Sequence, residues 1–239
     1  MMLFDNYTLK ARFYPVVLVF FPLVIVGIFY SFQFQSVIHL LTSIGLVGAL
    51  TYMFSQVGRD SGKLKEPSLW KSWGGMPTVQ ILRLADDTLD PHTKNRYHQK
   101  LFGECPVPVL PTIAMETNNA AEADEIYKAW TRYLITKTRD AEKFPLLLKD
   151  NTSYGFRRNL WGLKAFAISF IVLLLSGNYL FWVYHLRNWN PLIFPETFEF
   201  ASAVLLINLL VWLFIIRRDW VKIPAFSYAG RLCEGVEEI

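Results

Sequence analysis

The stretch FYPVVLVFFPLVIVGIFYSFQFQSVIHLLTSIGLVGALTYMFSQVG, residues 13–58, decides the fold. It contains no Asp, Glu, Lys or Arg, and His39 is its only side chain that titrates near neutral pH. A helix needs about 20 apolar residues to cross a hydrocarbon core of about 30 Å. The stretch therefore predicts two crossings, at about residues 14–32 and 36–54, joined by a tight turn. Its length, and the second apolar segment that follows at once, argue against a cleaved signal peptide.

Two later runs without charge, residues 165–184 and 200–216, bring the expected number of crossings to four. The second run is short, but Arg217 and Arg218 can snorkel and extend it. Only 18% of the 239 residues are charged, against about a quarter in soluble domains, and the mean hydropathy is +0.26. We expect an α-helical integral membrane protein with four transmembrane helices, arranged as two hairpins with a mainly helical domain between the second and third.

The placement of Lys and Arg predicts the orientation. The turn at residues 33–35 has no charge, and the loop at 185–199 holds Arg187 against Glu196 and Glu199. The opposite side of the predicted membrane carries many cations: Lys10, Arg12, Arg59, Lys63, Lys65, Arg157, Arg158, Lys164, Arg217, Arg218 and Lys222. Because cytoplasmic loops are enriched in Lys and Arg, we expect both termini in the cytosol.

These expectations divide the chain into five parts: an N-terminal cytosolic or interfacial segment that includes Leu3 and Phe4 (1–12), a first hairpin (13–55), a cytosolic domain (56–163), a second hairpin (164–217) and a cytosolic tail (218–239). Pro67 suits a first helical position, so a short helix is expected from Glu66 to Trp73, ended by two glycines. Asn118 or Asn119 can cap a longer helix that reaches about Glu142. Shorter helical elements are expected at 78–83, 92–101, 146–151 and, after Pro224, 226–236, with 106–111 extended.

Motifs for catalysis or metal binding are not evident. Cys105 and Cys233 fall on the cytosolic side and are expected to be free thiols. His92, His98 and Cys105 match no common zinc spacing, so ordinary side-chain roles are favoured. The segment at 58–63 has the wrong glycine spacing for a phosphate-binding loop and lacks the Ser or Thr after its lysine. We therefore expect no enzymatic activity, no metal and no cofactor.

Cationic and aromatic side chains gather where the cytosolic domain meets the predicted membrane. The positive-inside bias and contact with anionic lipid headgroups account for most of this charge. The alternative is an anionic ligand, a nucleotide or short nucleic acid, held by stacking on Trp70, Trp73, Tyr97, Tyr154 and Phe156. Residues 56–160 hold sixteen Lys and Arg against thirteen Asp and Glu, which permits only a local site. The candidate ligand-binding residues are Arg59, Lys63, Lys65, Lys71, Trp73, Arg157 and Arg158.

The predicted spans carry no charge at mid-depth, unlike most pumps and ion-coupled transporters. Their mild polarity provides three candidate pore-lining residues, Thr42, Asn178 and Asn208, although such side chains more often join neighbouring helices. Four helices leave no room for a water-filled path within one protomer. A pore therefore requires a homo-oligomer, with a tetramer as one candidate state.

Several short motifs, in order, resemble those of an uncharacterised family of bacterial four-crossing membrane proteins. They are Arg59-Asp-Ser-Gly-Lys63, Glu66-Pro67, Leu69-Trp70, Trp73-Gly-Gly-Met-Pro-Thr78, Tyr97-His98, Ala123-Asp124, Lys137-Thr-Arg-Asp140 and Tyr154-Gly-Phe-Arg-Arg-Asn-Leu160. The chain is similar, through this family, to the membrane effector of Hailong-type antiphage defence systems. The resemblance implies the bacterial inner membrane, and a partner nucleotidyltransferase whose short single-stranded DNA oligomers hold an oligomeric channel closed. It assigns no individual ligand contacts.

The leading hypothesis is a homo-oligomeric effector that depolarises the membrane as an ion channel or pore, controlled by an anionic ligand. Such a protein needs no catalysis, because a ligand biases a closed-to-open equilibrium through its differential affinity for the two states. The alternative hypothesis is a membrane anchor or scaffold that recruits a soluble partner through its cytosolic domain.

Overall fold

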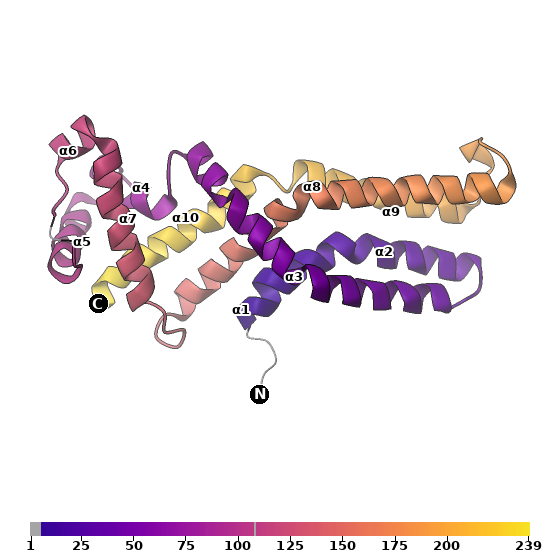
Figure 1. The fold of residues 1–239 in the computed structure, drawn as a ribbon, viewed down its shortest axis with the longest axis horizontal. Helices are drawn as coiled ribbons and strands as arrows, with labels where there is room; N and C mark the ends of the chain where they lie inside the picture. The colour runs from indigo at the N-terminus through magenta and orange to yellow at the C-terminus, as the bar shows by residue number, and fades with distance from the viewer. Residues whose placement is uncertain (1–5, 108) are drawn as a thin grey trace. The chain divides into compact units, whose positions relative to one another are not determined.

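The computed structural model describes residues 6–107 and 109–239, and these residues form helices and no strands. Leu3 and Phe4 of the expected N-terminal segment, and Pro108 of the expected extended stretch, lie outside the described residues. Figure 1 shows the helices, whose bounds are α1 Asn6–Thr8, η1 Leu9–Phe13, α2 Tyr14–Gln33, α3 Ile38–Trp73, α4 Pro77–Leu82, α5 Pro91–Glu104, α6 Ile113–Asn118, α7 Ala120–Lys137, α8 Pro145–Leu186, η2 Pro191–Ile193, α9 Glu196–Phe214, α10 Arg218–Glu234 and η3 Gly235–Glu238.

Four of these helices are long and apolar enough to cross a membrane. The candidate spans lie in α2, α3, α8 and α9, and each overlaps an uncharged run of the sequence. The expectation of an all-helical chain with four such helices is therefore confirmed.

Helix α3 is longer than the sequence predicted. It continues without interruption from Ile38 to Trp73, so the expected helix end near residue 54 and the separate start at Glu66 are wrong. Pro67 lies inside α3. Because proline has no backbone N–H, one hydrogen bond of the helix is missing there, and the helix continues on both sides. The expected end is correct: Gly74 and Gly75 have φ of 93° and 135°, and the Gly75 amide donates to the Trp70 carbonyl at 2.8 Å.

Three other helix boundaries also differ from expectation. Helix α8 begins at Pro145 and does not stop at residue 151, so the expected short helix is only its first part. Helix α10 passes through Pro224 instead of beginning after it. Helix α7, capped by the Asn119 side chain as expected, ends at Lys137 and not at Glu142.

The chain forms two compact units. Unit 1 comprises Met1–Lys65 and Gly155–Val221, and unit 2 comprises Glu66–Tyr154 and Lys222–Ile239. The chain passes from one unit to the other inside α3, α8 and α10, not in loops.

Unit 1 is held together by interlocking apolar side chains of its long helices. The Phe20 ring of α2 meets the rings of Phe54 on α3 and Phe170 on α8, with centroids 5.4 and 5.2 Å apart. Edge-to-face aromatic pairs of this kind add about 0.5–1.5 kcal/mol beyond the area they bury. Val16, Ala167 and Leu205 are fully buried in the same cluster.

Unit 2 has its own core, centred on α7. Tyr127, Trp130 and Leu134 recur at helical spacing and are fully buried. Residues of α5, and Leu232 and Val236 near the C-terminal end, complete this cluster. Both cysteines lie in it as free thiols, which confirms the expectation for Cys105 and Cys233.

Candidate functional site

Glycines allow α3 and α8 to cross in direct backbone contact within unit 1. A Cβ atom on Gly162 would lie 2.5 Å from the Gly62 nitrogen and 2.7 Å from its Cα. Ser61 Oγ and Lys65 Nζ both donate to the Gly162 carbonyl, at 2.8 and 2.6 Å. Buried Asn159, next to the crossing, donates to the Ala11 carbonyl at 2.7 Å and so joins the N-terminal helices to α8.

Three of the predicted ligand cations take part in the internal contacts of unit 1. Lys65 is bound at the glycine crossing. Arg157 donates to the Trp220 carbonyl at 2.9 Å, and its guanidinium lies 4.6 Å from the centre of the Trp220 ring. Arg158 is only 8% exposed, and its guanidinium lies 3.4 Å from the Asn159 amide oxygen. These positions serve packing, which weakens the prediction that they bind a ligand.

The other four predicted ligand residues are divided between the two units. Arg59, which is half-buried, and Lys63, which is exposed, lie in the unit 1 part of α3. Lys71 is exposed in unit 2. Trp73 is 8% exposed and contacts Phe226 edge-on, so its ring is a core element and offers no open face for stacking.

A surface hollow in unit 2 combines an aromatic side chain with two cations; we call it the Trp70 hollow. Its volume is about 480 Å³, and it lies between the end of α3, the turn into α4, and α7. Its lining residues are Pro67, Trp70, Gly75, Met76, Val79, Asp124, Lys128 and Arg132. The glycine turn brings the chain back beside Trp70, because the positive φ values of Gly74 and Gly75 reverse its direction.

A chain of two hydrogen bonds holds the indole of Trp70 in place. Its Nε1 donates to the Tyr154 hydroxyl at 3.3 Å, and that hydroxyl donates to the Glu66 carboxylate at 2.6 Å. These bonds join α3 to α8 within unit 2 and fix the orientation of the ring. A ring fixed in this way is a preorganised stacking surface.

The charges around the hollow leave it locally basic. Asp124 is neutralised by Arg83, which donates to its two oxygens at 2.9 and 2.7 Å and whose own pKa is raised by these hydrogen bonds. Lys128 pairs with Glu125 at 2.7 Å, an exposed pair that contributes little and that an incoming anion can displace. Arg132 is exposed and forms no ion pair with any residue the structure describes.

The expected pore-lining residues have different environments. Asn178 is 5% exposed; it accepts from Tyr30 Oη at 2.6 Å and donates to Ser202 Oγ at 2.9 Å, and so joins α2, α8 and α9. Asn208 has a buried side-chain oxygen without a partner among the described residues. Thr42 lies on the exposed face of α3.

The histidines and cysteines considered for zinc are not gathered into a site. His98 is 2% exposed, and its Nε2 lies 2.8 Å from the Leu82 carbonyl oxygen. Its ring packs against the rings of Tyr127 and Trp130. Residues 6–107 and 109–239 contain no group of three or more His, Cys, Asp or Glu placed to hold a metal ion.

Sequence reasoning missed Lys128 and Arg132. A signal was present, because these two cations are four residues apart on α7 and so share one face. What the sequence could not show is that this face meets Trp70, fifty-eight residues earlier in the chain than Lys128.

Comparison of the chain with protein-family models, with curated proteins and with solved structures finds no match.

Proposed function

We propose that this protein is a ligand-controlled membrane effector that acts as a homo-oligomer. The four apolar helices form two hairpins in the bacterial inner membrane, both termini and unit 2 are cytosolic, and ions pass between subunits. The controlling ligand carries phosphate and flat aromatic groups, as a nucleotide or short single-stranded DNA does. The observation that carries the proposal is the Trp70 hollow.

The hollow provides the two features that bind such a ligand. Bases stack on a fixed aromatic ring, at about 1–3 kcal/mol per base, without regard to sequence. Guanidinium and ammonium groups bind phosphate through charge-assisted hydrogen bonds, and Arg132 and Lys128 stand at the same hollow as Trp70. Asp124 opposes an anion only weakly, since Arg83 already neutralises it.

The outer face of α3 supports assembly of several copies. Thr42, Gly45, Ala49, Tyr52 and Gln56 recur every three or four residues, and all five are exposed. A Cβ added to Gly45 would meet nothing within 4 Å. The small residues Thr42, Gly45 and Ala49 let membrane helices approach closely, and Thr42 and Gln56 add polar groups that a conducting path between subunits requires.

In the defence role implied by the resemblance, a partner nucleotidyltransferase makes the ligand, and its loss during infection opens the channel. The driving force comes from the membrane potential, about 2.3 kcal/mol per charge per 100 mV. The protein therefore needs only a difference in ligand affinity between its closed and open states.

Binding of a fluorescently labelled short single-stranded DNA to purified full-length protein tests the site. We expect Trp70→Ala to weaken binding about fivefold to a hundredfold, as loss of one stacked base predicts. Arg132→Ala weakens binding and lowers its salt dependence by about one phosphate contact. Lys149→Ala, the same loss of charge at an exposed position outside the hollow, leaves the affinity unchanged. Equal binding by all four proteins contradicts the assignment.

The alternative, a membrane anchor that recruits a soluble partner, is favoured by a separate observation. Ile113 at the start of α6 is 71% exposed beside a second hollow of about 330 Å³ that Arg83 and Glu116 also line. Capture of a stable partner that Ile113→Asp abolishes, together with an unchanged membrane potential on overexpression, would support this alternative and count against the effector.

A further inference from the structure

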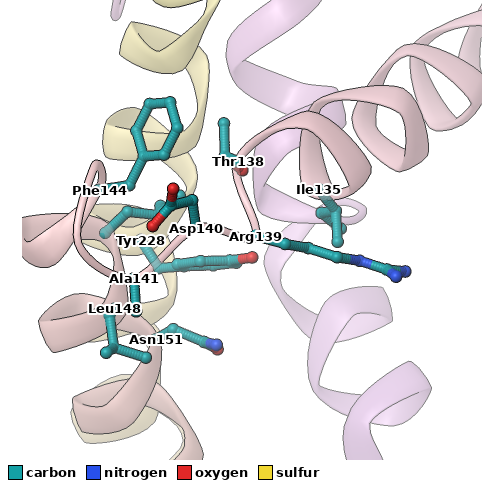
Figure 2. A pocket seen from close by; sticks show the side chains of 10 residues that line it. Ile135, Thr138, Arg139, Asp140, Ala141, Phe144, Leu148, Asn151 and Tyr228 are labelled. Carbon is teal, nitrogen blue, oxygen red and sulfur yellow. The ribbon is translucent and has the colours of Figure 1, made fainter.

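A further pocket lies in unit 2 where α7 turns into α8; we call it the corner pocket. Its volume is about 180 Å³, room for a body the size of one aromatic ring. Ile135, Phe144, Leu147 and Leu148 supply apolar walls, and the ring of Tyr228 from α10 lies between the two connected helices (Figure 2). None of these residues lines the Trp70 hollow.

Two polar side chains at the corner pocket lack partners among the described residues. The Arg139 guanidinium forms no ion pair there, and the Asn151 amide forms no hydrogen bond. Figure 2 shows both side chains and the Tyr228 hydroxyl extending toward the same side of the pocket. A cation, an amide and a phenol around an apolar chamber are the groups that orient a small ligand.

The carboxylates nearby are already engaged, so they do not neutralise Arg139. Asp140 Oδ1 accepts from the backbone amides of Glu142 and Lys143, at 2.9 and 3.2 Å. Figure 2 shows the Arg139 side chain extending away from this carboxylate. Asp150, one residue before Asn151, faces Arg231 at 3.7 Å. The positive end of α8 adds to the potential that favours a negative group.

We propose that the corner pocket binds a small amphipathic anion: one compact apolar or aromatic body with a single carboxylate or phosphate. The body fills the chamber against Tyr228 and Phe144, and the anionic group receives hydrogen bonds from Arg139 and Asn151. This site is separate from the Trp70 hollow and does not depend on the function proposed for it.

Titration of the full-length protein in detergent with benzoate, phenyl phosphate and benzyl alcohol tests the site. The probes share the ring and differ in the anionic group, so comparison of the first two distinguishes a carboxylate from a phosphate ligand. We expect saturable binding of at least one anion. The affinity for benzyl alcohol should be lower by a factor of about ten or more, because a charged hydrogen bond is lost. Benzyl alcohol also reports partition into the micelle.

Variants localise the binding. Arg139→Ala is expected to lower the affinity for the anion about tenfold or more and to leave the binding of benzyl alcohol unchanged. Asn151→Leu, which keeps the approximate volume of the side chain, lowers the affinity for the anion by a smaller factor. Arg132→Ala removes the same charge from α7 at the Trp70 hollow and is the matched control, with wild-type anion affinity expected. Because Arg139 is exposed, its loss is not expected to unfold the protein, and the circular dichroism melting curve checks this.

The proposal is overturned if neither anion binds saturably, if all three probes bind alike, or if Arg139→Ala and Arg132→Ala have equal effects. A failure here leaves oligonucleotide binding at the Trp70 hollow intact, since that measurement uses different variants and a different ligand.

Discussion

Gly162 has only a hydrogen atom as its side chain, and this permits backbone contact between α8 and α3. We expect Gly162→Ala to destabilise the protein by about 1–3 kcal/mol, because the new methyl group overlaps the backbone of α3 at Gly62. Gly177→Ala is the matched control, since it lies on the same helix with nothing within 4 Å of its Cβ, and alanine there should stabilise slightly. Thermal unfolding in detergent compares the two. An unchanged melting temperature for Gly162→Ala would show that the crossing is looser than described.

His98 makes unit 2 sensitive to acid. Burial lowers the pKa of His98 below its ordinary value of 6.5, and the Lys94 charge acts in the same direction. The unfolded chain therefore takes up a proton at a higher pH than the folded chain does. The free energy of unfolding is expected to fall as the pH drops below about 6.5, by up to about 1.4 kcal/mol per unit of pKa difference.

Denaturation of the wild type and of His98→Gln across this pH range measures the contribution. The amide of the variant can still donate to the Leu82 carbonyl but does not titrate, so its stability should vary less with pH. Parallel curves for the two proteins would exclude His98 as the source of the acid sensitivity.

At the scale of helices, Asn178 joins α8 to α2 and α9. We expect the Tyr30→Phe and Asn178→Leu double-mutant cycle to give a coupling energy of about 0.5–1.7 kcal/mol, the range found for hydrogen bonds between membrane helices. The cycle is measured by unfolding in detergent. Val172→Ala with Tyr30→Phe is the control cycle, since Val172 is exposed on α8 and should be uncoupled. Equal coupling in both cycles would mean that the Tyr30–Asn178 bond contributes nothing specific.

The long helices could be read from the sequence, whereas α6 and several helix ends could not. The uncharged runs placed α2, α8 and α9 because composition alone decides where an apolar helix is stable in lipid. The helix end expected near residue 54 is wrong. The change from apolar to polar residues there marks a change in the environment of the helix, while the helical backbone continues. Pro67 and Pro224 wrongly indicated helix boundaries for a related reason. Packing on either side of each proline holds the helix together although one backbone N–H is missing.

At the scale of the whole molecule, the chain joins its two units through α3, α8 and α10. Glu66 and Tyr154, the residues at which unit 2 begins and ends on these helices, are hydrogen-bonded to each other. The same Tyr154 hydroxyl accepts from Trp70 in the hollow. In the proposed mechanism, a ligand stacked on Trp70 acts on both helices through these bonds.

The candidate site was only partly predictable from the sequence. Three of the seven residues nominated from the sequence have internal partners that the sequence did not reveal, since Lys65, Arg157 and Arg158 bind carbonyl and amide oxygens inside unit 1. Trp73 and Trp70 are three residues apart, and only packing decides which is buried. Long-range contacts of this kind leave no periodic signal in a single sequence.

Ion flux through proteoliposomes measures both proposed properties, conduction and its control by a ligand. Purified protein is reconstituted into liposomes with a potassium gradient, and flux is recorded with and without short single-stranded DNA, for the wild type and for the Trp70→Ala, Arg132→Ala double variant. We expect the wild type to conduct, the DNA to change its flux, and the double variant to conduct without responding to the DNA. Absence of flux from the wild type under both conditions, or an equal response of the double variant to the DNA, would contradict the proposed function.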